Sequence, residues 1–339
     1  MSRRMRMKTS FPVYIFLFTI PFFFSRILPA LHGASPTQEQ HQPPQVSEAL
    51  AEGYRLLEEK DYAGAELSFR RALGTGTRTG AAHRGLGRAL WSQGFLESSE
   101  HSLERAVDLE PSDAAVQMDL ARLRDDLSRS ASTPGRRETY RQEAEASYRQ
   151  VLELEPDNLK ARLRLGNLLL ESRRVPEAVR EAENAARLAP GNVKARLLLA
   201  RAHQLKGDWG RAEVQFKEVL ALQPNHTQAL VGLGEVLRER GDLTAAAERL
   251  QAAVRAQPGL WEAHRALGEV HLLAKRSPEA VRAFTRAVEL EPRDWQSRFH
   301  LGMLLRDRGR LPEATEHLEQ VIAAKPNHLA AYEELGYVL

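Results

Sequence analysis

The chain has 339 residues, contains no cysteine and carries a formal net charge of +3 at neutral pH. The lack of cysteine excludes disulfides, thiolate metal sites and thiol nucleophiles. Five basic residues and no acidic residue lie within 1–34, so the rest of the chain has a net charge of −2. A slightly acidic body does not favour nucleic acid as a partner.

Alanine, leucine, glutamate and arginine dominate the composition, and only 6% of the residues are aromatic. All four are strong helix formers, and runs of β-branched residues are almost missing beyond residue 34. The composition therefore predicts an all-α body.

Residues 1–34 have the features of a secretory signal peptide. A basic stretch precedes the uncharged run Phe11–Phe24, and small residues such as Ala30 and Ala34 follow it. The alternative is an uncleaved N-terminal membrane anchor over Phe11–Leu31. In both cases we expect the body to be exported, as a periplasmic protein or one anchored to the inner membrane of a bacterium with the rest outside the cytoplasm.

Residues 35–46 are polar and rich in proline. Such a segment cannot bury an apolar face, so we expect a disordered linker.

Beyond residue 46 the sequence repeats with a period of 34 residues. When the repeats are aligned, each repeat position forms a column of equivalent residues. Small residues recur in the columns of Gly53 and Ala65, and a mostly large apolar residue recurs in the column of Phe69. A period of this length indicates stacked units that pack on their neighbours. Prolines mark the period at Pro156, Pro190, Pro224, Pro258, Pro292 and Pro326.

Each unit divides into two amphipathic stretches separated by a turn that often contains glycine, as at Gly94 and Gly207. We therefore predict a helix–turn–helix unit. Small residues at the Gly53 and Ala65 columns would let its two helices approach closely, and the larger residue of the Phe69 column would fill the space between units.

These columns of glycine, alanine, phenylalanine and proline resemble the tetratricopeptide repeat. The resemblance implies an all-α, right-handed α-solenoid of about eight helix–turn–helix units plus a terminal helix. The expected units are 46–79, 80–113, 114–158, 159–192, 193–226, 227–260, 261–294, 295–328 and a partial unit 329–339.

The third unit is 45 residues long, and its excess lies near Asp125–Thr139. We expect this insertion to lengthen one helix and add a loop, either as a tolerated surface feature or as a contact for a partner. Acidic pairs such as Asp125-Asp126 are expected on solvated helix faces.

At the C-terminal end of the chain, Leu335, Val338 and Leu339 are expected to lack cover, which makes self-association through 329–339 an open alternative.

The sequence contains no phosphate-binding glycine loop, no His-Glu-x-x-His motif and no nucleophile elbow. Its eleven histidines are scattered, and His264 and His271 have no carboxylate at a fixed spacing beside them. We therefore expect no catalytic residues, no metal site and no cofactor.

The family resemblance implies that a peptide or protein binds to the concave inner surface, to which the first helix of each unit contributes fixed positions. These positions change from basic to mainly acidic at about residue 226. The residues carried over from the family pattern are Arg84, Arg88, Arg122, Lys160, Asn167, Lys194, Arg201, Glu235, Glu239, Glu262, Glu269, Phe299 and Met303.

Two interpretations of this surface stay open: ordinary solvated charge, or a polarised groove for an extended segment whose charge sets orientation and encounter rate. Chaperone-binding members of the family hold a C-terminal carboxylate with paired lysines and asparagines. That pairing is missing here, so the resemblance assigns no such partner.

We expect a non-catalytic scaffold or adaptor of the bacterial cell envelope that binds a protein or peptide and no nucleic acid, and contacts membrane only through an uncleaved leader. The alternatives are an accessory or shortened relative of a repeat-containing envelope enzyme, from a glycosyltransferase or peptidase system, and a self-associating assembly factor.

Overall fold

The computed structural model describes residues 44–74 and 79–338 of the chain. The expected leader 1–34 and most of the expected linker 35–46 lie outside these residues. The first helix begins at Pro44, so the last three residues of the expected linker are helical. Among the described helices, none has both the length and the apolar character needed to cross a membrane.

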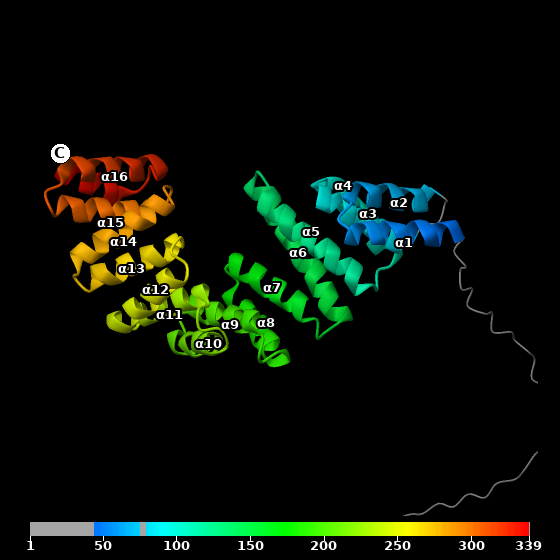
Figure 1. Ribbon diagram of the computed structural model, residues 1–339, viewed down its shortest axis with the longest axis horizontal. Coiled ribbons are helices and arrows are strands. Elements are labelled where there is room, and N and C mark those ends of the chain that lie inside the picture. Colours follow the sequence, from blue (N-terminus) through cyan, green and yellow to red (C-terminus); the bar gives the residue numbers. More distant parts are fainter. Residues whose placement is uncertain (1–43, 75–78, 339) are drawn as a thin grey trace, which may run out of the picture. The chain divides into compact units, whose positions relative to one another are not determined.

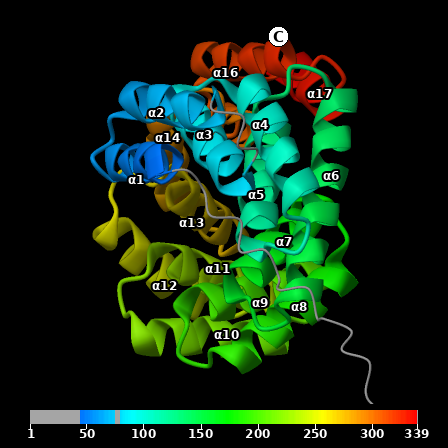
Figure 2. The same ribbon diagram turned by 90° about the vertical axis from the view of Figure 1, so that its right-hand side faces the viewer.

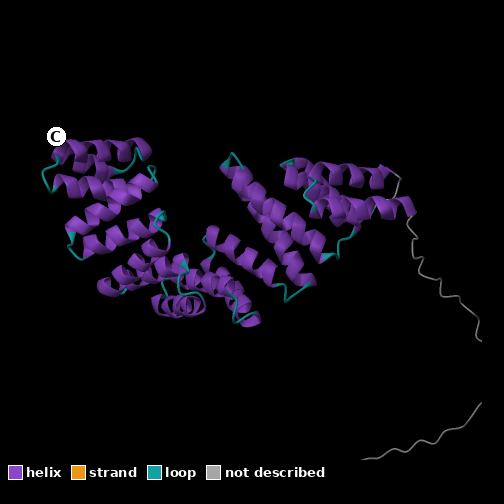
Figure 3. Cartoon of the chain, in the orientation of Figure 1, coloured by secondary structure: helices purple, strands orange, loops and turns teal. Residues whose placement is uncertain are grey.

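The regular structure of the described residues is entirely α-helical, which confirms the predicted fold class (Figures 1 and 3). Seventeen helices follow one another in chain order within these residues (Figure 2). They are α1 (Pro44–Glu58), α2 (Tyr62–Gly74), α3 (Gly80–Gln93), α4 (Leu96–Leu109), α5 (Ala114–Ser130), α6 (Pro134–Leu154), α7 (Leu159–Glu171), α8 (Val175–Leu188), α9 (Val193–Lys206), α10 (Trp209–Leu222), α11 (Thr227–Glu239), α12 (Leu243–Ala256), α13 (Trp261–Leu273), α14 (Ser277–Leu290), α15 (Trp295–Arg306), α16 (Leu311–Ala324) and α17 (Leu329–Val338).

The helices pack as consecutive pairs, from α1 with α2 to α15 with α16, and each pair packs on the next. Odd-numbered helices of most neighbouring pairs also contact each other, as α3 does with α5 and α7 with α9. This arrangement is a helical solenoid in which the first helices of successive pairs share one layer. A side chain at a given position of these helices therefore recurs along that layer.

One to three residues after the first helix, every pair except the lengthened third has a residue in the left-handed backbone conformation. Glycine holds this position at Gly94 and Gly207, with φ of 87° and 80°, as the turn glycines predicted. Lys60, Arg173 and Lys275 hold the same repeat position with φ of 63°, 59° and 57°. The turn geometry is thus kept even where the sequence lacks glycine.

Close approach of the two helices of a pair explains the small residues, as predicted. A Cβ atom added at Gly234 on α11 would lie 2.6 Å from Cγ of Leu250 on α12, and Ala246 is fully buried in the same contact. Phe216 of α10 instead lies against Gly232 of α11, in the next pair. The large residue of that column therefore packs both within its own pair, as Phe284 does against Gly268, and between pairs, as Phe216 does against Gly232.

The prediction for the third unit was wrong in its detail. Both α5 and α6 are lengthened, to 17 and 21 residues, and the connection between them is only residues 131–133. The Pro-Gly sequence begins a helix rather than a loop, because Pro134 occupies the first turn of α6, where proline is tolerated. The side chain of Thr133 accepts a hydrogen bond from Arg136 N at 3.4 Å and caps the helix.

Two further expectations need correction. Asp125 is only 2% exposed, because it lies on the inner side of the lengthened α5, whereas its neighbour Asp126 is half-buried. In α17, Val338 is buried and Leu335 packs against the same hydrophobic core, so these residues are covered. The exposed apolar side chains of α17 include Leu329 and Tyr337 instead. Leu339 lies outside the described residues.

Candidate functional site

A cavity of about 870 Å³ lies along the first helices of four successive pairs, α3, α5, α7 and α9. Its lining includes residues from both ends of α5 and α7, and Gln228 at the start of α11 closes the series. The structure brings seven of the predicted groove residues together in this cavity: Arg84, Arg88, Arg122, Lys160, Asn167, Lys194 and Arg201.

The repeat places these side chains. Lys160 and Lys194 hold the second position of α7 and α9, and Asn167 and Arg201 hold the ninth position of the same helices. Residues with the same place in successive helices form rows along the layer, because each pair repeats the packing of the one before. The cavity therefore has rows of like side chains rather than a single cluster.

The lining carries a marked excess of positive charge. Eight basic and three acidic side chains face it, the acidic ones being Asp119, Glu155 and Glu171. Two of the basic residues, Arg129 and Arg164, were missed by the sequence analysis. Arg129 lies in the lengthened part of α5, outside the regular register, and Arg164 stands one residue after an expected groove position.

Some of the cations have partners within the protein. Arg84 Nε donates a hydrogen bond to Oδ2 of Asp119 at 2.7 Å, and Arg122 lies 3.8 Å from the other oxygen of the same carboxylate. The Arg122 guanidinium also stacks over the Trp91 ring, 5.1 Å from its centroid. These two arginines therefore have a structural role beside any role in binding.

The buried carboxylate of Asp125 holds two more cations of the lining. It lies 2.9 Å from Arg129 Nη2 and 3.7 Å from Arg164 Nη1. Burial raises the pKa of Asp125, while the charge of Arg129 opposes the shift. Asp125, which does not itself line the cavity, thus pairs with two arginines that do.

The remaining four cations are free. Arg88, Lys160, Lys194 and Arg201 are exposed, and their side chains form no ion pair or hydrogen bond with any residue that the structure describes. A charged group without an internal partner is hydrated and available for a ligand. These four residues are therefore the strongest candidates for contacts with a partner.

The expected acidic half of the groove does not form part of this cavity. Glu235 accepts a hydrogen bond from Gln204 Nε2 at 2.7 Å, and Arg238 pairs with both Glu239 and Glu269. Arg238 neutralises Glu239 and Glu269, whereas the partner of Glu235 is a neutral amide, so the expected change to a mainly acidic surface beyond residue 226 stays a prediction.

The other three expected residues are half-buried in the last units. Phe299 packs against the hydrophobic core and meets the His328 ring edge-on, with centroids 4.8 Å apart. Met303 follows it on α15, and Oε2 of Glu262 is buried with no hydrogen-bond partner among the described residues. Within these residues, no group of three or more histidines and acids gathers as a metal site.

Comparison with protein families decides what the solenoid is. Seven segments, some of them overlapping, match the tetratricopeptide repeat: 50–114, 85–131, 141–193, 197–260, 238–292, 265–328 and 299–339. The chain belongs to the tetratricopeptide repeat family. The matches continue through the regular units and are interrupted within the lengthened third unit.

Solved structures agree on the fold. The Cut9–Hcn1 hetero-tetramer of APC/C aligns with a TM-score of 0.60 and 17% identity over 86% of this chain, which spans 55% of that protein's length. A tetratricopeptide repeat protein from Parabacteroides merdae aligns with a TM-score of 0.58 and 16% identity, covering 78% of this chain and all of that one. Comparison with curated proteins finds no match.

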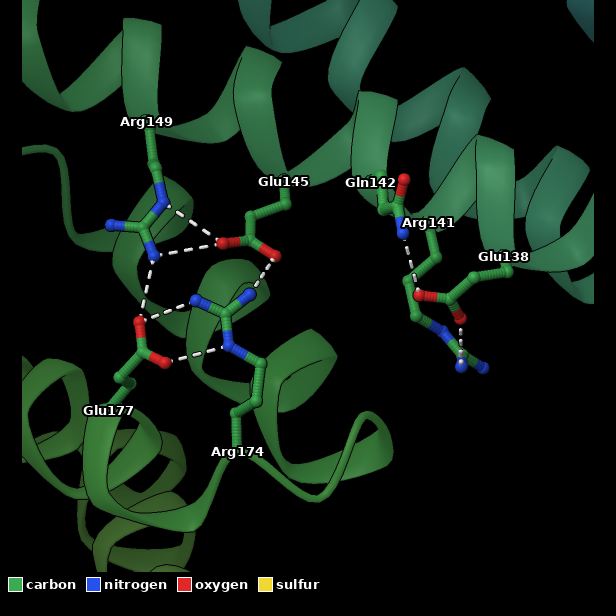
Figure 4. A network of polar contacts seen from close by, with 7 residues as sticks. All are labelled: Glu138, Arg141, Gln142, Glu145, Arg149, Arg174 and Glu177. Carbon is green, nitrogen blue, oxygen red and sulfur yellow. Dashed lines mark hydrogen bonds and ion pairs between the residues drawn. The ribbon is translucent and has the colours of Figure 1, made fainter.

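An ionic network joins the third and fourth tetratricopeptide units (Figure 4). Arg174, which precedes α8, donates to Glu145 of α6 at 2.6 Å and to Glu177 of α8 at 2.6 Å. Arg149 of α6 bonds to both carboxylates, at 2.9 Å and 3.1 Å. The four side chains link the lengthened helix α6 to the next unit.

Proposed function

We propose that this protein is a non-catalytic interaction scaffold that binds a peptide or protein segment along the layer formed by α3, α5, α7 and α9. One observation carries the proposal: a cavity built by successive tetratricopeptide units contains four cations, Arg88, Lys160, Lys194 and Arg201, whose side chains have no partner among the described residues. A segment lying across the units could neutralise all four.

The chemistry of the lining supports binding rather than covalent catalysis. The cavity is lined by arginines, lysines, three carboxylates, amides such as Asn158 and Asn167, and aliphatic side chains. These groups hold a ligand by charge, hydrogen bonds and shape. Membership of the tetratricopeptide repeat family also supports a scaffold or adaptor role.

We further propose that the scaffold acts in the bacterial cell envelope, as a periplasmic or membrane-anchored protein. The support is the sequence of residues 1–34, which has a basic start, an uncharged apolar run and small residues near its end. Alkaline phosphatase fused after Leu339 should be active in a bacterial host. Activity only after the leader is deleted, or in neither form, would contradict export.

Site-specific photo-crosslinking tests the binding role. A photoreactive amino acid replaces Gln228, which lines the cavity, or Gln251, an exposed residue on α12 outside it. We expect the photoreactive group at position 228 to form discrete protein adducts in cells. The group at position 251 should form none of these adducts. Identical adducts from the two positions, or none from position 228, would refute binding in the cavity.

A further inference from the structure

We infer that the cavity binds an acidic polypeptide segment that also carries apolar side chains, which rests on the proposed binding role and adds the chemistry of the partner. The lining has two components that point to this ligand. One is the free positive charge, and the other is an apolar row between the cations.

The apolar row consists of Met118, Leu163 and Leu197, which hold the same repeat position in α5, α7 and α9. All three are half-buried, so each keeps part of its side chain open to the cavity. Covering these side chains with apolar groups of a ligand would remove further surface from water, which favours binding. The cavity therefore selects for more than charge.

The cations flank this row on both sides. In α9, Lys194 lies three residues before Leu197 and Arg201 lies four residues after it. Residues at these spacings share one face of a helix, so the three side chains form a line across the layer. In α7, Lys160 and Leu163 repeat the first two members of that line. A ligand along the layer meets an apolar floor with positive charge at its edges.

Several carboxylates are needed rather than one. The free cations Arg88, Lys160, Lys194 and Arg201 lie on three different helices, α3, α7 and α9. A single terminal carboxylate would leave most of them unpaired. A segment with acidic residues spaced among apolar ones matches both the rows and the floor, and its charge would also speed encounter.

A nucleic acid fits the cavity less well. Single-stranded nucleic acid is held by aromatic side chains on which bases stack, and none of the twenty lining residues is aromatic. The leucine and methionine side chains of the lining offer no hydrogen bond to a sugar or phosphate.

Fluorescence anisotropy with the purified full chain tests the inference. The probe is a labelled peptide of glutamate, leucine and serine, acetylated and amidated so that it has no terminal charge. Matched probes carry glutamine in place of glutamate or serine in place of leucine, and a labelled poly-uridine represents nucleic acid. We expect the acidic, leucine-containing peptide to bind most tightly and to weaken as salt is raised.

The variant Lys160→Gln/Lys194→Gln removes two free cations without breaking an internal contact of the described residues. We expect it to bind the acidic peptide about tenfold more weakly. The matched control Arg180→Gln/Arg249→Gln removes two exposed charges outside the cavity and should change binding by less than about twofold.

Equal binding of the glutamine peptide, no binding of the acidic peptide, or tighter binding of poly-uridine would each overturn the inference. So would unchanged affinity of the Lys160→Gln/Lys194→Gln variant. These results leave the proposed scaffold role standing as long as the photoreactive group at position 228 captures a protein. Failure of that capture would overturn the scaffold role itself.

Discussion

Arg84 on α3 donates a hydrogen bond to Asp119 on α5 at 2.7 Å, and this bond joins two successive tetratricopeptide units at the edge of the basic cavity. Asp119 is only 6% exposed, so its carboxylate depends on Arg84 and on the nearby Arg122. The pair therefore belongs to the framework of the cavity, while the four free cations of the same lining are available to a ligand.

Loss of Arg84 should reduce stability more than loss of a free cation. Arg84→Met leaves the buried carboxylate of Asp119 without its hydrogen bond, which should cost about 1–2 kcal/mol in the free energy of unfolding. Lys160→Met, in the same cavity, should cost less than about 0.5 kcal/mol. Urea unfolding followed by circular dichroism compares the two. Equal losses would contradict a framework role for Arg84.

Two buried histidines should make the solenoid less stable in mild acid. His203 and His271 hold the repeat position that leucine holds at Leu169 and Leu237, and burial lowers the pKa of each imidazole. For His203, Asp208 opposes the shift and Arg211 adds to it; for His271, Glu279 opposes it and Arg276 and Arg282 add to it.

Because these pKa values are lowered on folding, the unfolded chain binds more protons below about pH 6.5, so stability falls as the pH drops through that value. The variant His203→Leu/His271→Leu should therefore lose less in melting temperature than the natural protein between about pH 7.5 and pH 5.5. Thermal unfolding at the two pH values measures this. A parallel loss in both proteins would show that the two imidazoles do not control the acid sensitivity.

The close contact of α11 with α12 should not tolerate a side chain. A Cβ at Gly234 would lie 2.6 Å from Leu250 Cγ, so Gly234→Leu should destabilise the protein by about 1–3 kcal/mol through overpacking. Gly259→Ala adds a methyl group where nothing lies within 4 Å and should be neutral within about 0.5 kcal/mol. The pair is compared by denaturant unfolding, and a neutral Gly234→Leu would rule out the packing explanation.

Arg174 and Glu145, which belong to the ionic network between the third and fourth units, should show a small but measurable coupling free energy. A double-mutant cycle with Arg174→Met and Glu145→Gln should give a coupling of about 0.5–1 kcal/mol, because Glu145 is well covered and Arg174 is only partly so. The exposed pair Arg310 and Glu313 serves as the control and should give less. A coupling no larger than that of the control would show that the network does not stabilise the contact between the two units.

The sequence was sufficient for the fold because every unit repeats the same packing. The positions of Gly234 and Ala246 are set by a contact between two helices that are neighbours in the chain, and a single period of the sequence contains both. The seven basic-half residues could be placed together for the same reason, since one register applied to α3, α5, α7 and α9 positions them all.

The repeat register could not predict features that depend on the lengthened third unit or on ion pairs between units. Arg129 enters the cavity only because α5 is longer than the period allows, and Asp125 is buried by the same extension. In the second half, the charge of Glu269 is neutralised by Arg238, which lies 31 residues earlier on another helix. The sequence predicts which charged residues lie on a surface. It does not predict which of them form ion pairs, because a pair between units depends on the distance that the two side chains can span.

Photo-crosslinking from Gln228 in the Lys160→Gln/Lys194→Gln background, compared with the Arg180→Gln/Arg249→Gln background, tests the central claim most directly. The account predicts that adducts at position 228 are strongly reduced in the first background and retained in the second. Adducts of equal yield in both backgrounds would contradict the claim that the free cations of the cavity hold the partner.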